Sequence, residues 1–305
     1  MFGGNLKKIR LWFWLLVGAL VACHSVEQEK AEKEIITNIN QQLAPKYEKA
    51  KTEQVLATEL KYLQKENKVS AELIASVFEA MALAQDKDEF NAQSNQLFEQ
   101  ALSRAKLLRR TDLELWAMSR YCFYLYKYRK YEASFPNFMN CMRHLDSMPA
   151  TEVIMPGETY KRIGYFLMSV GDLPTAETYL LKAKTYTLPN SGDLANILDN
   201  LGLVYISAND FAKAESYFKQ ALVVAQKSGD ELRHGKILGN IGDLKYRQKK
   251  YDEATNFLLQ DIAFSKKATN TQNTIYALVL LGKVYLAKGE VGLAMSNLKE
   301  AQVYA

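Results

Sequence analysis

The sequence has few of the residues that tight turns require. It contains only 15 glycines and 6 prolines among 305 residues. Strand-rich folds reverse direction often, and glycine and proline provide many of the backbone conformations that those reversals need. Hydrophobic residues nevertheless make up 48% of the chain, so a large core is possible. The combination favours an all-α fold.

Residue groupings that support catalysis are also missing. The chain has three histidines, His24, His144 and His234, and none has the spacing of a zinc site or a catalytic triad. No glycine-rich loop follows an expected strand, so the phosphate-binding motifs of nucleotide-dependent enzymes are absent as well. We therefore expect no enzymatic activity, no metal site and no cofactor.

Acidic residues are absent from the first 22 positions, where Lys7, Lys8 and Arg10 lie. The net charge of the chain is +5, and it falls to +2 when these three cations are left out. A remainder so close to neutral lacks the basic excess that is typical of nucleic-acid binding. We therefore expect no nucleic acid among the partners.

The first 22 residues have the pattern of a signal peptide. The three cations precede an apolar run from Leu11 to Ala22, which is 12 residues long. A membrane-spanning helix needs about 20 apolar residues, so the run is too short to be one. Polar sequence begins at His24, directly after the run. Residues 1–22 are therefore predicted to be a targeting segment that is removed.

The end of the apolar run reads Leu20-Val21-Ala22-Cys23, which resembles the lipobox of bacterial lipoproteins. The resemblance implies a diacylglyceryl group on Cys23, cleavage before it, and acylation of the new amino group by a fatty acid such as palmitate. Because the following residue is not aspartate, it also implies the outer membrane of the envelope over the inner one. The alternative is an ordinary signal peptide with a chance cysteine. Residues 23–74 are expected to form a charged tether and N-terminal helices.

A pattern of small and bulky residues recurs about every forty positions. Its first small residue is Gly164, Gly202, Gly242 or Gly282, and the spacings are 38, 40 and 40. A second small residue follows in each unit, at Ala176, Ala214, Ala254 and Ala294. The pattern extends more faintly upstream, which gives about six units over residues 75–305, best defined over 157–305. A glycine inside a helix costs about 1 kcal/mol relative to alanine, so glycines at one phase indicate close helix packing.

Each unit has the periodicity of two helices separated by a short polar turn. The array resembles the tetratricopeptide repeat family in its version of about forty residues. The resemblance implies a right-handed superhelical solenoid of antiparallel helix pairs. Lys245 and Asp261 depart from it, since they place charges at core positions. Cys122 and Cys141 stand at small-residue positions, where they either fill the core or form a disulfide.

The resemblance also implies a concave groove lined by the first helix of each unit. The residues expected to contact a partner there are Trp116, Phe123, Tyr126, Tyr165, Met168, Asn200, Leu203, Asn240, Asp243, Tyr246 and Lys283. The same register adds Ser119, Glu158, Lys161, Asn196, Asp199, Ile206, Lys236, Gly239, Tyr276 and Val279. Two interpretations of Asn200 and Asn240 stay open. Either they clamp the backbone or carboxylate of a ligand, as in some relatives, or they bond locally within the repeat.

These features predict an envelope-anchored scaffold or adaptor that binds a protein or peptide in the groove. The alternative is the sensory input region of a longer or truncated signalling protein. The sequence stops at Ala305 with no polar capping helix after the last unit, which would leave Leu298, Ala301 and Val303 uncovered. We therefore also expect self-association through this end as a further kind of contact.

Overall fold

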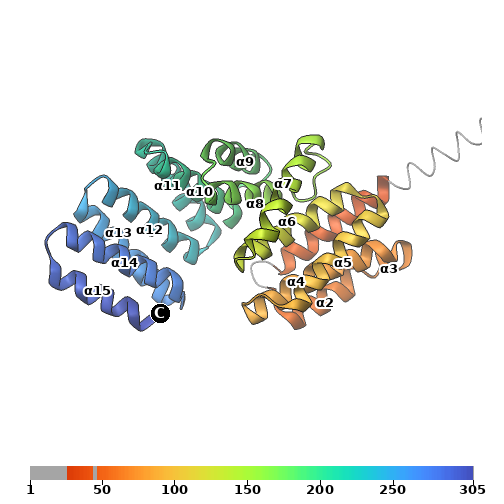
Figure 1. Ribbon diagram of the computed structural model, residues 1–305, viewed down its shortest axis with the longest axis horizontal. Coiled ribbons are helices and arrows are strands. Elements are labelled where there is room, and N and C mark those ends of the chain that lie inside the picture. Colours follow the sequence, from red (N-terminus) through yellow and green to blue (C-terminus); the bar gives the residue numbers. More distant parts are fainter. Residues whose placement is uncertain (1–25, 44–46, 305) are drawn as a thin grey trace, which may run out of the picture. The chain divides into compact units, whose positions relative to one another are not determined.

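The computed structural model describes residues 26–43 and 47–304, and within these ranges all regular secondary structure is α-helical (Figure 1). The predicted fold class, an all-α solenoid of antiparallel helix pairs, is confirmed. The chain divides into two compact units, of which unit 1 ends at Met155 and unit 2 begins at Pro156. The predicted boundary near residue 75 therefore lies inside unit 1.

Helices follow one another with short connections in both units. Unit 1 contains a helix over residues 26–43, α2 (Lys49–Glu59), α3 (Leu63–Glu66), α4 (Lys68–Lys87), α5 (Ala92–Leu108), α6 (Thr111–Lys127) and α7 (Tyr131–Ser147). Unit 2 contains α8 (Pro156–Ser169), α9 (Leu173–Thr185), α10 (Gly192–Ser207), α11 (Phe211–Ser228), α12 (Glu231–Arg247), α13 (Tyr251–Lys267), α14 (Thr271–Ala287) and α15 (Val291–Tyr304).

Polar residues between the helices of unit 2 begin and end them. The side chains of Asp210, Asp230 and Asn270 each accept a hydrogen bond from the backbone N–H three residues later, at 2.9–3.1 Å. This arrangement satisfies one of the N–H groups that the first turn of a helix leaves without a partner. Gly229 ends α11 in the left-handed conformation, with φ of 69°. The turn residues therefore fix where each repeat begins.

The recurring glycines lie where the first helix of a pair crosses the second. A Cβ atom added at Gly202 would lie 2.4 Å from the Phe218 ring, and one added at Gly242 would lie 2.7 Å from Leu258 Cγ. Gly164 has the same relation to Leu180, at 2.7 Å. Such separations are too short for any larger side chain. The second small residues, Ala176, Ala214, Ala254 and Ala294, are all fully buried at the same crossings.

The two charges at core positions are both buried in unit 2, and each has its own partners. Lys245 on α12 lies 3.4 Å from Glu215 and 3.1 Å from Glu253, so carboxylates from the second helices on both sides pair with it. Asp261 on α13 is fully buried and accepts hydrogen bonds from Ser265 and Asn273. Paired and hydrogen-bonded charges can occupy such positions, whereas isolated ones cost several kcal/mol.

Residues 26–43, where the sequence predicted part of a charged tether, form a packed helix. Residues 26–43 are helical, and Ile36, Ile39 and Leu43 are fully buried in the same core as the side chains of α4 and α6. Glu32 is also fully buried, and its carboxylate lies 2.5 Å from the guanidinium of Arg110. The charged pattern that suggested a tether is therefore one face of a packed helix.

The predicted signal peptide and Cys23 lie outside the described residues. Among the helices that the structure does describe, none combines the length and the hydrophobicity needed to cross a bilayer.

Candidate binding surface

The first helices of unit 2 lie on the inner side of its stack. α8 contacts α10, α10 contacts α12, and α12 contacts α14. No two successive second helices of this unit contact each other to the same extent. Elements on the inner side of a curved stack approach one another most closely, so the first helices form its concave side. We call the side chains of α8, α10, α12 and α14 that point away from the second helices the inner face of unit 2.

A cluster of amides and charges occupies this inner face between α10 and α12. Asn240 donates a hydrogen bond from Nδ2 to the buried carboxylate of Asp199 at 2.8 Å. Burial raises the pKa of Asp199 to about 6, and the Asn240 hydrogen bond and the charges of Arg233 and Lys236 act in the opposite direction. The cluster therefore holds an acid that titrates close to neutral pH.

Asn196 connects the remaining members of the cluster. Its amide lies 2.9 Å from the amide nitrogen of Asn200, one helical turn further along α10. When its amide is turned so that the oxygen faces Arg233, that oxygen accepts from two guanidinium nitrogens at 2.8 and 2.9 Å instead of from Asn200. Amides from one helix and a cation from the next thus lie within hydrogen-bond distance.

Lys236 is a cation of this surface that has no direct partner in the described part of the chain. Its side chain is half-buried on α12, and it makes no hydrogen bond or ion pair with another described residue. Burial lowers its pKa, the charge of Arg233 lowers it further, and the carboxylates of Asp199, Asp230 and Asp261 oppose the change. The ammonium group is thus partly dehydrated without a direct counter-ion, a condition that an acidic ligand group would relieve.

Asp261 lies on a second helix, but its side chain approaches the same cluster where glycines leave space on α12. A Cβ atom added at Gly239 would lie 2.2 Å from Asp261 Oδ2, and one added at Gly235 would lie 3.5 Å from Oδ1. Asn273 of α14 donates to Oδ1 at 2.7 Å. Burial raises the pKa of Asp261 to about 6, against the hydrogen bonds from Ser265 and Asn273 and the charge of Lys236.

The predicted residues of unit 2 are mostly accessible, but Asp199, Asn200, Ile206 and Gly239 are buried. Tyr165, Met168, Leu203, Asn240, Asp243 and Tyr246 are half-buried, and Lys283 is exposed. Asn200 is buried, and its amide bonds within the repeat to Asn196. Asp243 carries an ion pair with Arg247 at 2.9 Å. Local bonding therefore describes Asn200, whereas Asn240 bonds across two helices to Asp199.

Trp116 does not belong to an accessible surface, so this part of the prediction is wrong. Its side chain is fully buried in unit 1, with its ring centroid 5.6 Å from that of Phe78. The guanidinium carbon of Arg120 lies 4.7 Å from the Trp116 ring centroid. Phe123 and Tyr126, predicted on the same helix, are half-buried. Buried side chains therefore cover more of the circumference of α6 than the repeat register predicts.

Three residues of the cluster, Arg233, Asn273 and Asp261, are missing from the predicted set. Arg233 and Asn273 are forty residues apart, at matching positions near the N-termini of α12 and α14. The forty-residue register could have identified both residues, because Asp193 occupies the matching position on α10 and also forms a polar contact with a neighbouring first helix, an ion pair with Lys161 of α8. The position of Asp261 was harder to predict, because its only indication in the sequence is the pair of glycines on α12, Gly235 and Gly239, four residues apart.

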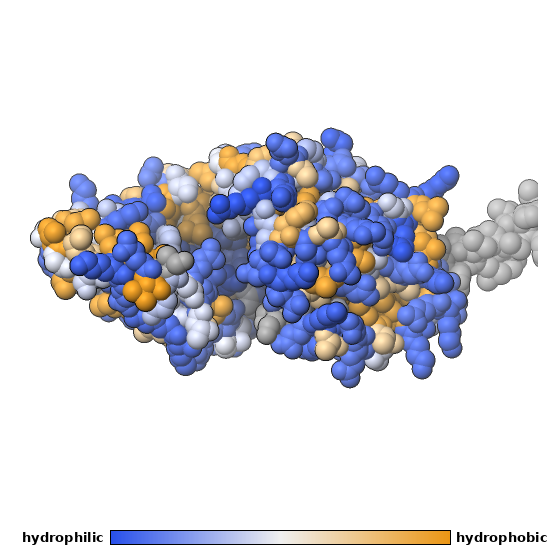
Figure 2. Space-filling view, turned by 60° about the horizontal axis from the view of Figure 1, so that its bottom comes forward, coloured by the Kyte–Doolittle hydropathy of each residue, from blue (hydrophilic) through white to orange (hydrophobic). Residues whose placement is uncertain are grey.

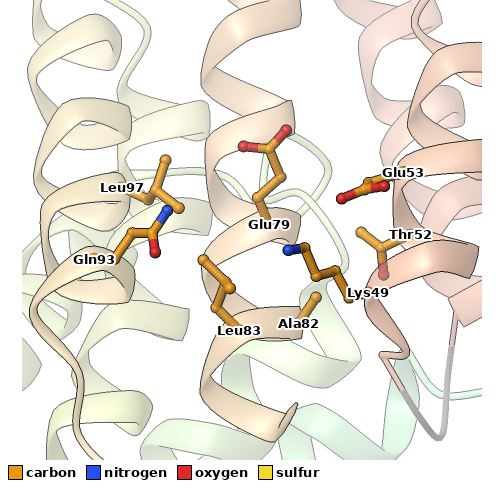
Figure 3. Close-up of a pocket in the computed structure, with 8 residues that line it drawn as sticks. All are labelled: Lys49, Thr52, Glu53, Glu79, Ala82, Leu83, Gln93 and Leu97. Carbon is orange, nitrogen blue, oxygen red and sulfur yellow. The ribbon is translucent and has the colours of Figure 1, made fainter. Parts of the chain in front are cut away.

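Unit 1 contains a separate cavity of about 320 Å³ between α2, α4 and α5. Figure 3 shows Glu79 of α4 in its centre, Glu53 and Lys49 of α2 on one side and Leu97 of α5 on the other. Burial raises the pKa of Glu79, and the charge of Glu53 raises it further.

Across the described part of the chain, no three histidine, cysteine, aspartate or glutamate side chains are grouped so that they could hold a metal ion.

The last helix of unit 2 exposes apolar side chains. Val291, Leu293 and Met295 are about half-exposed, and Val303 is 84% exposed, whereas Ala301 is buried. Figure 2 shows hydrophobic side chains on the surface at this end of the unit. Of the three residues expected to be uncovered, only Val303 is exposed, whereas Leu298 is half-buried and Ala301 is buried.

The fold and the inner face together define a helical-repeat protein in which first helices present a polar surface. Residues 157–227, which correspond closely to α8 to α11, match the tetratricopeptide repeat family. This match supports the resemblance that the glycine pattern predicts. No curated protein matches the chain.

Solved structures share the fold at low sequence identity. A Rap protein complexed with competence and sporulation factor has a TM-score of 0.69 and 14% identity, over 92% of this chain and 76% of that chain. The apo form of the quorum sensor NprR from B. thuringiensis has a TM-score of 0.62 and 15% identity, over 83% and 72%. The Cut9–Hcn1 hetero-tetramer of the APC/C has a TM-score of 0.61 and 18% identity, over 85% of this chain and only 44% of that chain. At these identities the likeness shows the fold alone.

Proposed function

We propose that the chain is a scaffold that binds a protein or peptide on the inner face of unit 2 and is held at the bacterial envelope by lipid on Cys23. The observation that carries the proposal is the cluster of Asn196, Asn240, Arg233 and Lys236 on two adjacent first helices. Amide side chains both donate and accept hydrogen bonds, so they suit the backbone of a bound chain.

The spacing of the helices supports an extended ligand. Packed helices lie about 8–10 Å apart, and an extended chain advances about 3.3 Å per residue. Amides on successive first helices therefore reach backbone groups about three residues apart. Lys236, with no counter-ion in direct contact, favours a ligand with an acidic group at this point. Similar solenoids include a Rap protein solved with a bound factor, which agrees with this use of the fold.

Site-specific photocrosslinking in intact cells tests the surface. A photoreactive amino acid is placed at Leu203 or Tyr276 on the inner face, and at Leu259 on α13 as a control that is 50% exposed on a second helix. We expect one dominant adduct from the inner positions and none from Leu259. Equal adducts at all three positions would contradict a specific inner-face site.

A substitution that leaves the fold intact separates binding from stability. Lys236→Met removes the ammonium group without breaking any described hydrogen bond and keeps the apolar part of the side chain. Lys299→Met, at an exposed position on α15, is the matched control. We expect Lys236→Met to reduce adduct formation at least about tenfold, equivalent to about 1.4 kcal/mol, with unchanged helicity. Equal adduct yields from the two variants would remove Lys236 from the site.

The membrane anchor has its own test. Cells grown with labelled palmitate should incorporate the label into the wild-type chain, and the label should be lost in Cys23→Ser. The same variant should leave the membrane fraction, because stable anchoring depends on the acyl chains. A labelled Cys23→Ser chain, or an unlabelled wild type, would refute lipidation at this residue without affecting the proposal for the inner face.

A further inference from the structure

Two cysteines in unit 1 face each other where α6 crosses α7. The sulfur atoms of Cys122 and Cys141 lie 3.9 Å apart, and both side chains are fully buried. Both are thiols in the structure. Ser134 Oγ of α7 donates a hydrogen bond to the backbone oxygen of Cys122 at 3.0 Å, and Phe138 is fully buried one turn further along α7. The two helices are therefore held in register at this crossing.

The repeat register explains why these two helices come so close. Cys122 occupies the position of Gly202 and Gly242, and Cys141 occupies that of Ala221. A disulfide requires Cα atoms within about 7 Å and sulfurs about 2 Å apart, and helix pairs seldom approach that closely except at small residues. Starting from 3.9 Å, the sulfurs must move about 2 Å closer. Rotation of both side chains about their Cα–Cβ bonds can contribute most of this movement.

We propose that Cys122 and Cys141 form an intramolecular disulfide that joins α6 to α7 when the chain meets a disulfide oxidant. One thiolate attacks the oxidant RSSR, forms a mixed disulfide and releases one RSH. The second thiolate attacks the mixed disulfide, closes the Cys122–Cys141 bond and releases another RSH. The two protons of the cysteine thiols end on the two released thiols, so RSSR is reduced and the chain is oxidised. An exported chain meets such oxidants in the envelope.

Burial controls when this reaction occurs. Because neither sulfur is accessible, the oxidant must react before the α6–α7 hairpin closes or while α7 is open. Pro136 lies inside α7, where it lacks an N–H group and removes one helical hydrogen bond. Local opening is easiest where such bonds are missing. We expect oxidation during refolding to be at least about tenfold faster than oxidation of the folded chain.

The experiment uses the full chain, purified in detergent and reduced. One sample is unfolded and refolded in a mixture of oxidised and reduced glutathione, and another is exposed to the same mixture while folded. Trypsin digestion without reduction should then yield residues 121–127 joined to residues 131–143. The thermal unfolding midpoint of the oxidised chain should exceed that of the reduced chain, because the crosslink restricts the unfolded state.

Cys141→Ala is the matched control, because alanine occupies the corresponding position of other repeats and should fold there. Cys122→Ala is a second variant that removes the other sulfur. Neither variant should form the joined peptide, and neither should show an unfolding midpoint that depends on glutathione. The proposal is overturned if both wild-type thiols remain titratable after refolding. It is equally overturned if Cys122 or Cys141 pairs instead with Cys23 or with a second chain.

Discussion

Replacing Gly239 by alanine should destabilise unit 2 only while Asp261 is present. The new Cβ atom would lie 2.2 Å from Asp261 Oδ2 and 3.0 Å from its Cγ. The carboxylate cannot move away, because it is fully buried and Ser265 and Asn273 both donate to its other oxygen. Overpacking of this kind costs about 1–3 kcal/mol. Replacing a glycine inside a helix by alanine gains about 1 kcal/mol, so the net effect should be a loss of up to about 2 kcal/mol.

Asp261→Ala removes the obstacle, and it installs the residue found at positions 183 and 221. In that background Gly239→Ala should stabilise by about 1 kcal/mol, so the two substitutions should couple by about 1–3 kcal/mol. Urea denaturation of the four chains at neutral pH, followed by circular dichroism, measures this coupling. Gly292→Ala serves as the control, because nothing lies within 4 Å of its added Cβ. If Gly239→Ala has the same effect in both backgrounds, within about 0.5 kcal/mol, the argument from the clash is refuted.

Three further predictions concern stability. The pKa values of Asp199 and Asp261 are about 6 in the folded chain and about 3.8 in an unfolded one, so each carboxyl contributes stability below about pH 4 that is lost as the pH rises through 6. The thermal unfolding midpoint should therefore fall between pH 4 and pH 6, by an amount that corresponds to at most about 3 kcal/mol per carboxyl, and Asp261→Ala should reduce this fall. Trp116→Ala should cost unit 1 about 3–5 kcal/mol, and a loss below about 1 kcal/mol in chemical denaturation would contradict its core position. Lys249 has φ of 60° where the matching Gly289 has 80°, so Lys249→Gly should increase the free energy of unfolding in urea by up to about 1 kcal/mol and Gly289→Lys should decrease it.

Local patterns in the sequence were sufficient to predict the fold. Each helix pair depends on small residues at one phase and on polar caps between helices, and these signals lie within about forty consecutive residues. The array could therefore be predicted from repetition alone. The N-terminal segment could not, because Glu32 pairs with Arg110 across 78 positions of sequence and no local pattern indicates that contact.

The candidate surface was predictable only in part, for a similar reason. The register placed Asn240, Asp243 and Lys283 correctly on a first helix, because helical periodicity determines which way each side chain points from its helix. It failed for Trp116, whose exposure depends on Phe78 from the preceding repeat and on Arg120 beside it. Burial is a property of neighbouring elements, so a register shared by all repeats cannot predict how each repeat is covered.

The close approach of α13 to Gly235 and Gly239 limits how this array can change over evolutionary time. Repeat arrays lengthen and shorten by duplication and recombination, and most exchanges between similar repeats should be tolerated. α12 and α13 are an exception, because Asp261 fits only against a helix that has glycine at position 239, and Phe264 of the same helix as Asp261 leaves no room for a Cβ atom at Gly235. A recombination point between these two helices would set Asp261 against a helix with a larger residue at position 239, or leave Gly239 facing an alanine. We therefore expect α12 and α13 to be exchanged only as a single block.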